Sequence, residues 1–91
     1  MTTTLTTDEA VRLVQQELLR IAPDADLASL PADAPFRQVL ELDSLDFLSL
    51  VEALADRAGI RIDEEDYDQL ETLEGSAAYL VRRASHPDTV R

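Results

Sequence analysis

The residues best suited to chemistry in this sequence are a serine and the aspartates beside it, in the run Asp43-Ser44-Leu45-Asp46. The pattern predicts that Ser44 is the first residue of a helix, with Asp43 as its N-cap. Unpaired backbone N–H groups and the positive end of the helix dipole stabilise an anion at such a place. An anionic group on the Ser44 hydroxyl would therefore be favoured there. The same two residues are also a common capping pair, so their types alone leave both interpretations open.

Groups that usually act as nucleophiles or bases are scarce. The 91-residue chain has no Cys and no Lys, and its single histidine is His86 near the C-terminal end. Thiolate and Schiff-base chemistry and zinc sites built on Cys or paired His are thereby excluded. A calcium loop beginning at Asp63 would need an oxygen ligand at Tyr67 and a glycine at Asp68, and both are missing. We therefore expect no metal site and no catalytic activity of the chain's own.

The excess of acidic over basic residues restricts the kinds of macromolecule that this protein can bind. Nineteen Asp and Glu against eight Arg give a net charge of −11. Residues 43–74 carry most of it, with eleven acidic residues against Arg57 and Arg61. So much negative charge repels nucleic acid and anionic membranes and favours basic proteins. With no secretory signal and no apolar run long enough to span a membrane, we expect a cytoplasmic protein.

The elements that must position Ser44 are all helical by periodicity. The sequence predicts an all-α fold, a small four-helix bundle of three longer helices and one short helix, with a long ordered loop between the first two. The longer helices are expected at about 7–22, 43–58 and 73–84, the loop at 23–42 with a helical turn over 36–40, and the short helix from residue 63 to about 70. We expect one domain over residues 1–91, with a core of about 6–85 and a flexible tail at 86–91.

Local signals predict where the helices begin and end. Thr6 and Glu9 have the spacing of a capping box for the first helix. Gly59 is the expected stop of the second helix, because glycine adopts the left-handed conformation without a Cβ penalty. Thr72 is the expected cap of the last helix.

The motif Asp43-Ser44-Leu45-Asp46, in register with these helices, resembles the acyl carrier protein family. The resemblance covers about residues 6–84 and includes the Gly59–Ile62 segment and the acidic short helix. It implies that Ser44, with Asp43 beside it, carries a 4′-phosphopantetheine arm derived from coenzyme A. The thiol of such an arm would supply the chemistry that the Cys-free chain lacks.

The resemblance implies an acyl carrier that presents thioester-bound intermediates to enzymes of fatty-acid, polyketide or related specialised biosynthesis. The implied partners are a phosphopantetheinyl transferase and acyl-loading, ketosynthase-type or acyltransferase-type enzymes with basic docking surfaces, and we expect the carrier to be a monomer. Apolar and acidic residues should form the contact surface. They are Leu45, Asp46, Leu48, Glu52, Asp56, Glu64 and Glu65.

Three positions depart from the family's pattern. Glu41 stands where a glycine is common, which predicts a less tightly turned approach to the helix. Ser49 replaces a usual acidic residue, and Glu52 a usual apolar one. We interpret these changes as a sign of dedicated partner enzymes.

Two further questions stay open at this point. The small residues 75–78 are expected to face the helix of 43–58, where they either leave room for an acyl chain or let the helices approach closely. The alternative functions are an aminoacyl or peptidyl carrier, which Asp43 disfavours, and an unmodified acidic helical adaptor that binds a basic protein.

Overall fold

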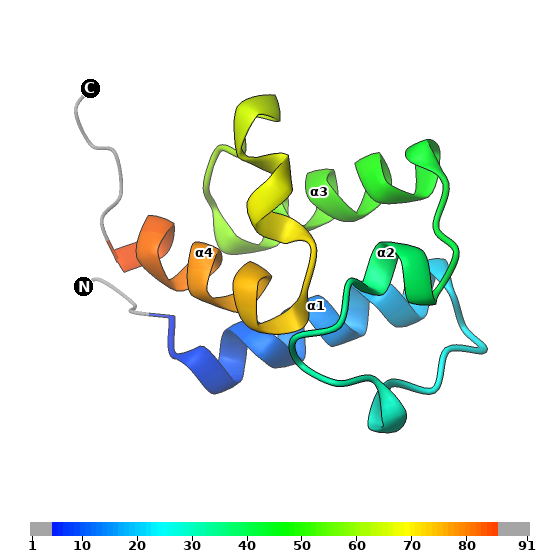
Figure 1. The fold of residues 1–91 in the computed structure, drawn as a ribbon. Coiled ribbons are helices and arrows are strands. Elements are labelled where there is room, and N and C mark those ends of the chain that lie inside the picture. The colour runs from blue at the N-terminus through cyan, green and yellow to red at the C-terminus, as the bar shows by residue number, and fades with distance from the viewer. Residues whose placement is uncertain (1–4, 86–91) are drawn as a thin grey trace.

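The computed structural model describes residues 5–85, and every regular element in that part of the chain is a helix (Figure 1). The elements are α1 Thr7–Ile21, η1 Leu27–Ser29, α2 Phe36–Val39, α3 Ser44–Ala58, η2 Glu64–Leu70 and α4 Leu73–Ser85, where η marks a 3-10 helix. The predicted all-α fold class is confirmed. The tail predicted over 86–91 lies outside the described residues.

The helix ends follow the predicted local signals. The Thr6 N–H donates to Oε1 of Glu9 at 3.0 Å, and the Glu9 N–H donates to Oγ1 of Thr6 at 3.1 Å, which completes the capping box. Gly59 ends α3 in the left-handed conformation, with φ of 69°. At the start of α4, the Gly75 N–H donates to Oγ1 of Thr72 at 2.9 Å.

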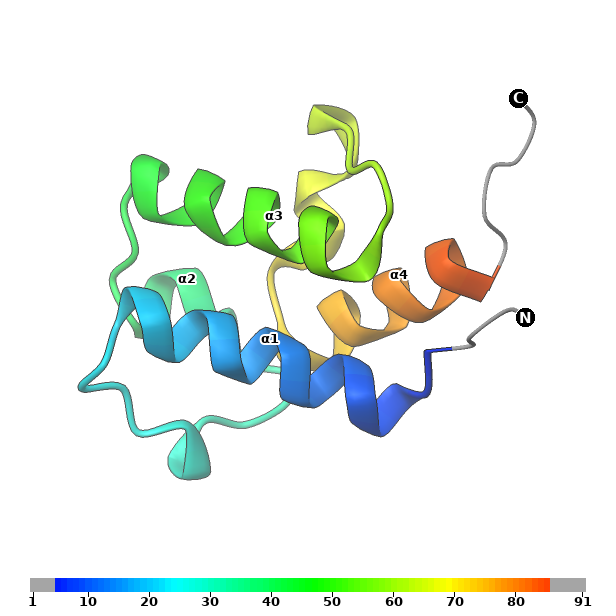
Figure 2. The same cartoon turned by 180° about the vertical axis from the view of Figure 1, so that it is seen from behind.

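Helix α1 lies against both α3 and α4, as the view from behind shows (Figure 2). Because it has two partners, it buries a broad face that includes Val14 and Leu18. Val11 and Ile21 are only half-buried. Further residues of α1 are buried instead, namely Ala10, Leu13 and Glu17.

The prediction that the small residues of α4 face α3 is wrong. The main neighbours of α4 are α1 and η2. A Cβ added at Gly75 would lie 2.9 Å from Oγ1 of Thr72 and 3.1 Å from the carbonyl oxygen of Gln69. Gly75 therefore allows the start of α4 to approach the end of η2 closely.

The long connection between α1 and α3 is ordered, as predicted. Two backbone hydrogen bonds fasten it to the junction of η2 and α4. The Phe36 N–H donates to the carbonyl of Glu71 at 2.9 Å, and the Glu74 N–H donates to the carbonyl of Ala32 at 3.0 Å. Phe36 is also fully buried. These contacts fix the position of α2 beneath the start of α3 (Figure 1).

Candidate functional site

Ser44 is the first residue of α3 and is exposed. Its neighbour Asp43 is the N-cap, and Oδ1 of Asp43 accepts a hydrogen bond from the Asp46 N–H at 2.8 Å. The predicted position of the serine is confirmed. The first backbone N–H groups of a helix have no acceptor within the helix. Asp43 engages that of Asp46, and those of Ser44 and Leu45 remain for an anion on the Ser44 side chain.

The turn that leads into α3 is tight, which contradicts the prediction of a looser approach. Glu41 adopts the left-handed conformation, with φ of 56°. The chain then turns so sharply that the Leu42 N–H donates to the carbonyl of Arg37 at 2.9 Å. Burial of the Leu42 side chain, which is 7% exposed, helps to hold this conformation without a glycine.

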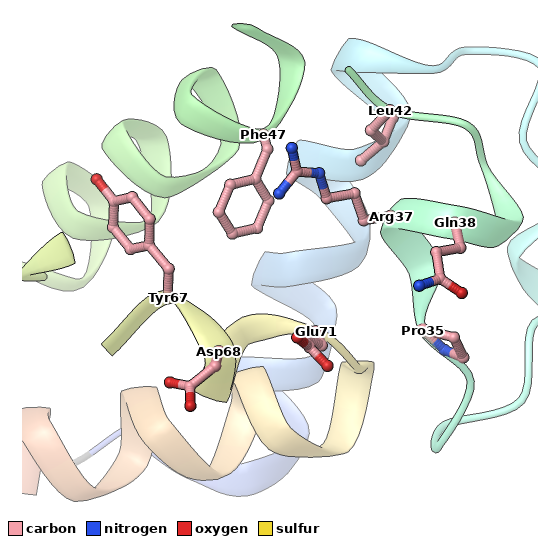
Figure 3. A pocket seen from close by; sticks show the side chains of 8 residues that line it. All are labelled: Pro35, Arg37, Gln38, Leu42, Phe47, Tyr67, Asp68 and Glu71. Atoms are coloured by element: carbon pink, nitrogen blue, oxygen red, sulfur yellow. The ribbon is translucent and has the colours of Figure 1, made fainter. Parts of the chain in front are cut away.

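This turn brings Arg37 of α2 next to Ser44. Nη2 of Arg37 lies 3.4 Å from Oγ of Ser44, a long hydrogen bond. The Arg37 guanidinium also lies over the Phe47 ring, 4.8 Å from the ring centroid (Figure 3). The sequence reasoning missed Arg37 altogether, because its closeness to Ser44 depends on the backbone conformation of Glu41.

A groove of about 530 Å³ lies between α2, the first turn of α3 and η2, and Arg37, the neighbour of Ser44, is among its lining residues (Figure 3). Its apolar part includes Leu42, Phe47 and Tyr67. The two aromatic rings meet edge to face, with centroids 5.5 Å apart. Polar side chains line the remainder, namely Arg37, Gln38, Asp68 and Glu71. A ligand in this groove would contact both kinds of surface.

Part of the predicted contact surface lies on one exposed face of α3. Leu45 is 75% exposed and Leu48 is 39% exposed. Glu52 and Asp56 are exposed as well and follow at steps of four residues, which places them on the same side of the helix. Asp46 is half-buried, and Glu64 and Glu65 are exposed at the start of η2.

Helix η2 forms one wall of the groove, and a hydrogen-bonded cluster of Asp66 of η2 with Tyr79 and Arg83 of α4 holds it in place. The Tyr79 hydroxyl donates to Oδ2 of Asp66 at 2.8 Å and accepts from Nη1 of Arg83 at 2.9 Å. Burial and the hydrogen bond to Asp66 raise the pKa of Tyr79 to about 12. Tyr79 therefore stays protonated at neutral pH and acts as a structural link between the two elements.

Comparison with known proteins identifies the family. The family described as a phosphopantetheine attachment site matches residues 9–80, most of the chain. An acyl carrier protein from Rubrobacter xylanophilus is 31% identical over 71 residues, 75% of this chain and 88% of that protein.

The chain belongs to the acyl carrier protein family. A second acyl carrier protein, from Bdellovibrio bacteriovorus, is 34% identical over 67 residues, 74% of this chain and 81% of its own length. No solved structure matches the chain significantly.

Membership of the acyl carrier protein family assigns a cofactor, the covalently attached 4′-phosphopantetheine. The residues present fit such a group, because an exposed serine hydroxyl stands at a helix N-terminus with a guanidinium 3.4 Å away. Over residues 5–85, no three His, Cys, Asp or Glu side chains are placed to hold a metal ion. In the same part of the chain, no helix is long and apolar enough to cross a membrane.

Proposed function

We propose that Ser44 is the residue that carries the 4′-phosphopantetheine arm. The observation that carries this proposal is the position of Ser44 as the exposed first residue of α3, capped by Asp43. Three other serines are less suited. Oγ of Ser29 donates to Asp26 at 2.8 Å, and Ser76 is fully buried. Ser49 is exposed but lies inside α3, where the backbone N–H groups are engaged in the helix.

In this proposal the chain is a carrier without catalytic activity of its own. The arm's thiol supplies the group that binds acyl or other biosynthetic intermediates as thioesters. The protein holds the phosphodiester end of the arm at the N-terminus of α3, where dipole and amide groups favour an anion. Partner enzymes of fatty-acid, polyketide or related specialised biosynthesis would act on the thioester. The predicted monomeric state and cytoplasmic location stay predictions.

Intact mass measurement tests the attachment residue. Incubation with coenzyme A and a phosphopantetheinyl transferase should add the mass of one 4′-phosphopantetheine to the wild type. Ser44→Ala should remain unmodified, whereas Ser49→Ala, the same substitution at an exposed serine of the same helix, should be modified like the wild type. Modification of Ser44→Ala would refute the assignment. An unmodified wild type would refute the carrier function and favour the acidic adaptor.

We further propose that the exposed face of α3 is where basic partner enzymes dock. Leu45 and Leu48 form an apolar centre, and acidic residues surround it, which suits a partner with an apolar socket and a basic rim. The acidic residues are Asp46, Glu52 and Asp56 on α3 and Glu64 and Glu65 on η2. The unusual Ser49 and Glu52 on this helix favour dedicated partner enzymes.

The type of cargo needs its own measurement. Mass analysis of the cargo on the purified protein would distinguish an acyl carrier from an aminoacyl carrier.

A further inference from the structure

Arg37 differs from four other arginines of the chain in the kind of group that its side chain contacts. The ion pairs found over residues 5–85 engage the side chains of Arg20, Arg57, Arg61 and Arg83. Arg37 takes part in none of them, although the chain has a net charge of −11. Its side chain is instead directed at a neutral group, Oγ of Ser44, at 3.4 Å. A guanidinium has five N–H donors, so this single long contact leaves most of them for another acceptor.

The Arg37 side chain is held in place before any ligand arrives. It is half-buried, and its guanidinium lies 4.8 Å from the centroid of the Phe47 ring, within the range of a cation–π interaction. The backbone at Arg37 is fixed as well, since its carbonyl accepts the Leu42 N–H at 2.9 Å. A charge that is already oriented binds an anion with less loss of conformational entropy than a freely moving one.

The charge of Arg37 is needed where the arm would be attached. Asp43 directly precedes Ser44, and its carboxylate is exposed, so a phosphodiester on Ser44 would have a negative neighbour. One oxygen of Asp43 accepts from the Asp46 N–H at 2.8 Å, which keeps that carboxylate at the helix start. Arg37 supplies the opposing positive charge within reach of the same oxygen atom that would be esterified.

We propose that Arg37 binds the phosphodiester of the arm and directs the first part of the arm across Phe47 into the groove between α2, α3 and η2. This rests on the proposed attachment at Ser44. Arginine suits the role because its planar fork can donate two parallel hydrogen bonds to phosphate oxygens. Arg37 and Phe47 both line the groove, so an arm held by Arg37 begins at the mouth of the groove instead of leading directly into solvent. Arg37 is thus a positioning residue.

The first test compares the apo and modified wild-type proteins by NMR of the arginine side chains. The Nε–H signal of Arg37 should shift and exchange more slowly with water once the arm is attached. Arg61 is the internal control, because its side chain is 85% exposed. It lies just beyond the C-terminal end of the 15-residue helix α3, and the helix rise puts that end roughly 22 Å from Ser44. An Arg37 signal that moves no more than that of Arg61 would overturn the proposal.

The second test uses Arg37→Gln, with Arg61→Gln as a control of equal charge change. Both variants are compared in their modified forms, and intact mass gives the extent of modification of each. The phosphorus NMR shift of modified Arg37→Gln should move toward that of the same phosphodiester in the urea-unfolded modified protein. NOEs between the arm and the Phe47 ring should be lost. Arg61→Gln should match the wild type. Complete modification of Arg37→Gln with unchanged spectra would refute the proposed role of Arg37 and leave the attachment at Ser44 standing. Failure to modify the wild type would refute the proposed function itself. If Arg37→Gln does not fold, the wild-type comparison decides.

Discussion

Glu17 of α1 and Arg57 of α3 form an ion pair at the interface of their helices. Nη1 of Arg57 donates to Oε2 of Glu17 at 2.9 Å, and the Glu17 side chain is only 3% exposed. Arg20 lies 3.6 Å from the other carboxylate oxygen. The pair fastens the last turn of α3 to α1, so it helps to set the direction of the helix whose opposite end carries Ser44.

Removing the arginine of this pair should destabilise the fold. Arg57→Met leaves a buried carboxylate with only the longer contact to Arg20, and we expect a loss of about 2 kcal/mol in the free energy of unfolding. The figure is below that of a fully buried pair because the Arg57 side chain is 40% exposed. Urea unfolding measures it. The double variant Glu17→Met/Arg57→Met should recover most of the loss, and equal stability of both variants would contradict this account.

Tyr79 should make the stability fall at high pH. The folded protein holds the phenolic proton more tightly than the unfolded chain, because burial and Asp66 raise the pKa of Tyr79 from 10.0 to about 12. The stabilisation from this group is therefore complete below about pH 10 and is lost as the pH rises toward 12. Denaturant unfolding across that range measures the slope. Tyr79→Phe should show a shallower decline, and a decline as steep as that of the wild type would assign the effect to other groups.

Glu41→Gly should stabilise the turn before α3. A left-handed conformation costs an L-residue about 1–2 kcal/mol, and glycine's larger loss of backbone entropy offsets about 0.5–1 kcal/mol of the gain. The net increase in the free energy of unfolding should be about 0.5–1 kcal/mol. Glu41→Ala is the control, since it removes the same charge but keeps a Cβ at φ of 56°. A gain in both variants would point to charge and not to backbone strain.

Leu45→Ala should weaken docking of partner enzymes without unfolding the protein. Leu45 is 75% exposed, so its loss removes little of the core. At the centre of an interface, its truncation should lower kcat/KM for the phosphopantetheinyl transferase about tenfold, equivalent to about 1.4 kcal/mol. Leu19→Ala provides the control, because Leu19 is another exposed leucine, 41% exposed, on α1. Equal kinetics of the two variants would remove Leu45 from the proposed surface.

The acidic part of the docking face should act mainly on the association rate. Glu52→Gln and Asp56→Asn together remove two exposed negative charges from α3. We expect a lower association rate with a basic partner at low ionic strength and a weaker dependence of that rate on salt. Stopped-flow measurements over a salt series would show it. An unchanged salt dependence would mean that these two carboxylates do not steer the encounter.

The sequence by itself determined the features that depend on neighbours three or four residues apart. The capping box of Thr6 and Glu9, the N-cap at Asp43 and the left-handed stop at Gly59 all follow from local hydrogen bonding and backbone preference. For the same reason, the place of Ser44 at the start of α3 was predictable. The family resemblance then gave the serine a chemical meaning that its place at the helix start alone would not have suggested.

Only the tertiary structure decided which surfaces meet. The residue type of Glu17 suggests a solvent-facing position, but the fold places Arg57, forty positions later, next to it. Helix α4 packs mainly on α1 and η2, which its small residues could not indicate. Arg37 reaches Ser44 because Glu41 accepts a left-handed backbone and the buried Leu42 holds it there. Such contacts arise from the packing of the whole chain, and a residue's type and local spacing do not specify its distant neighbours.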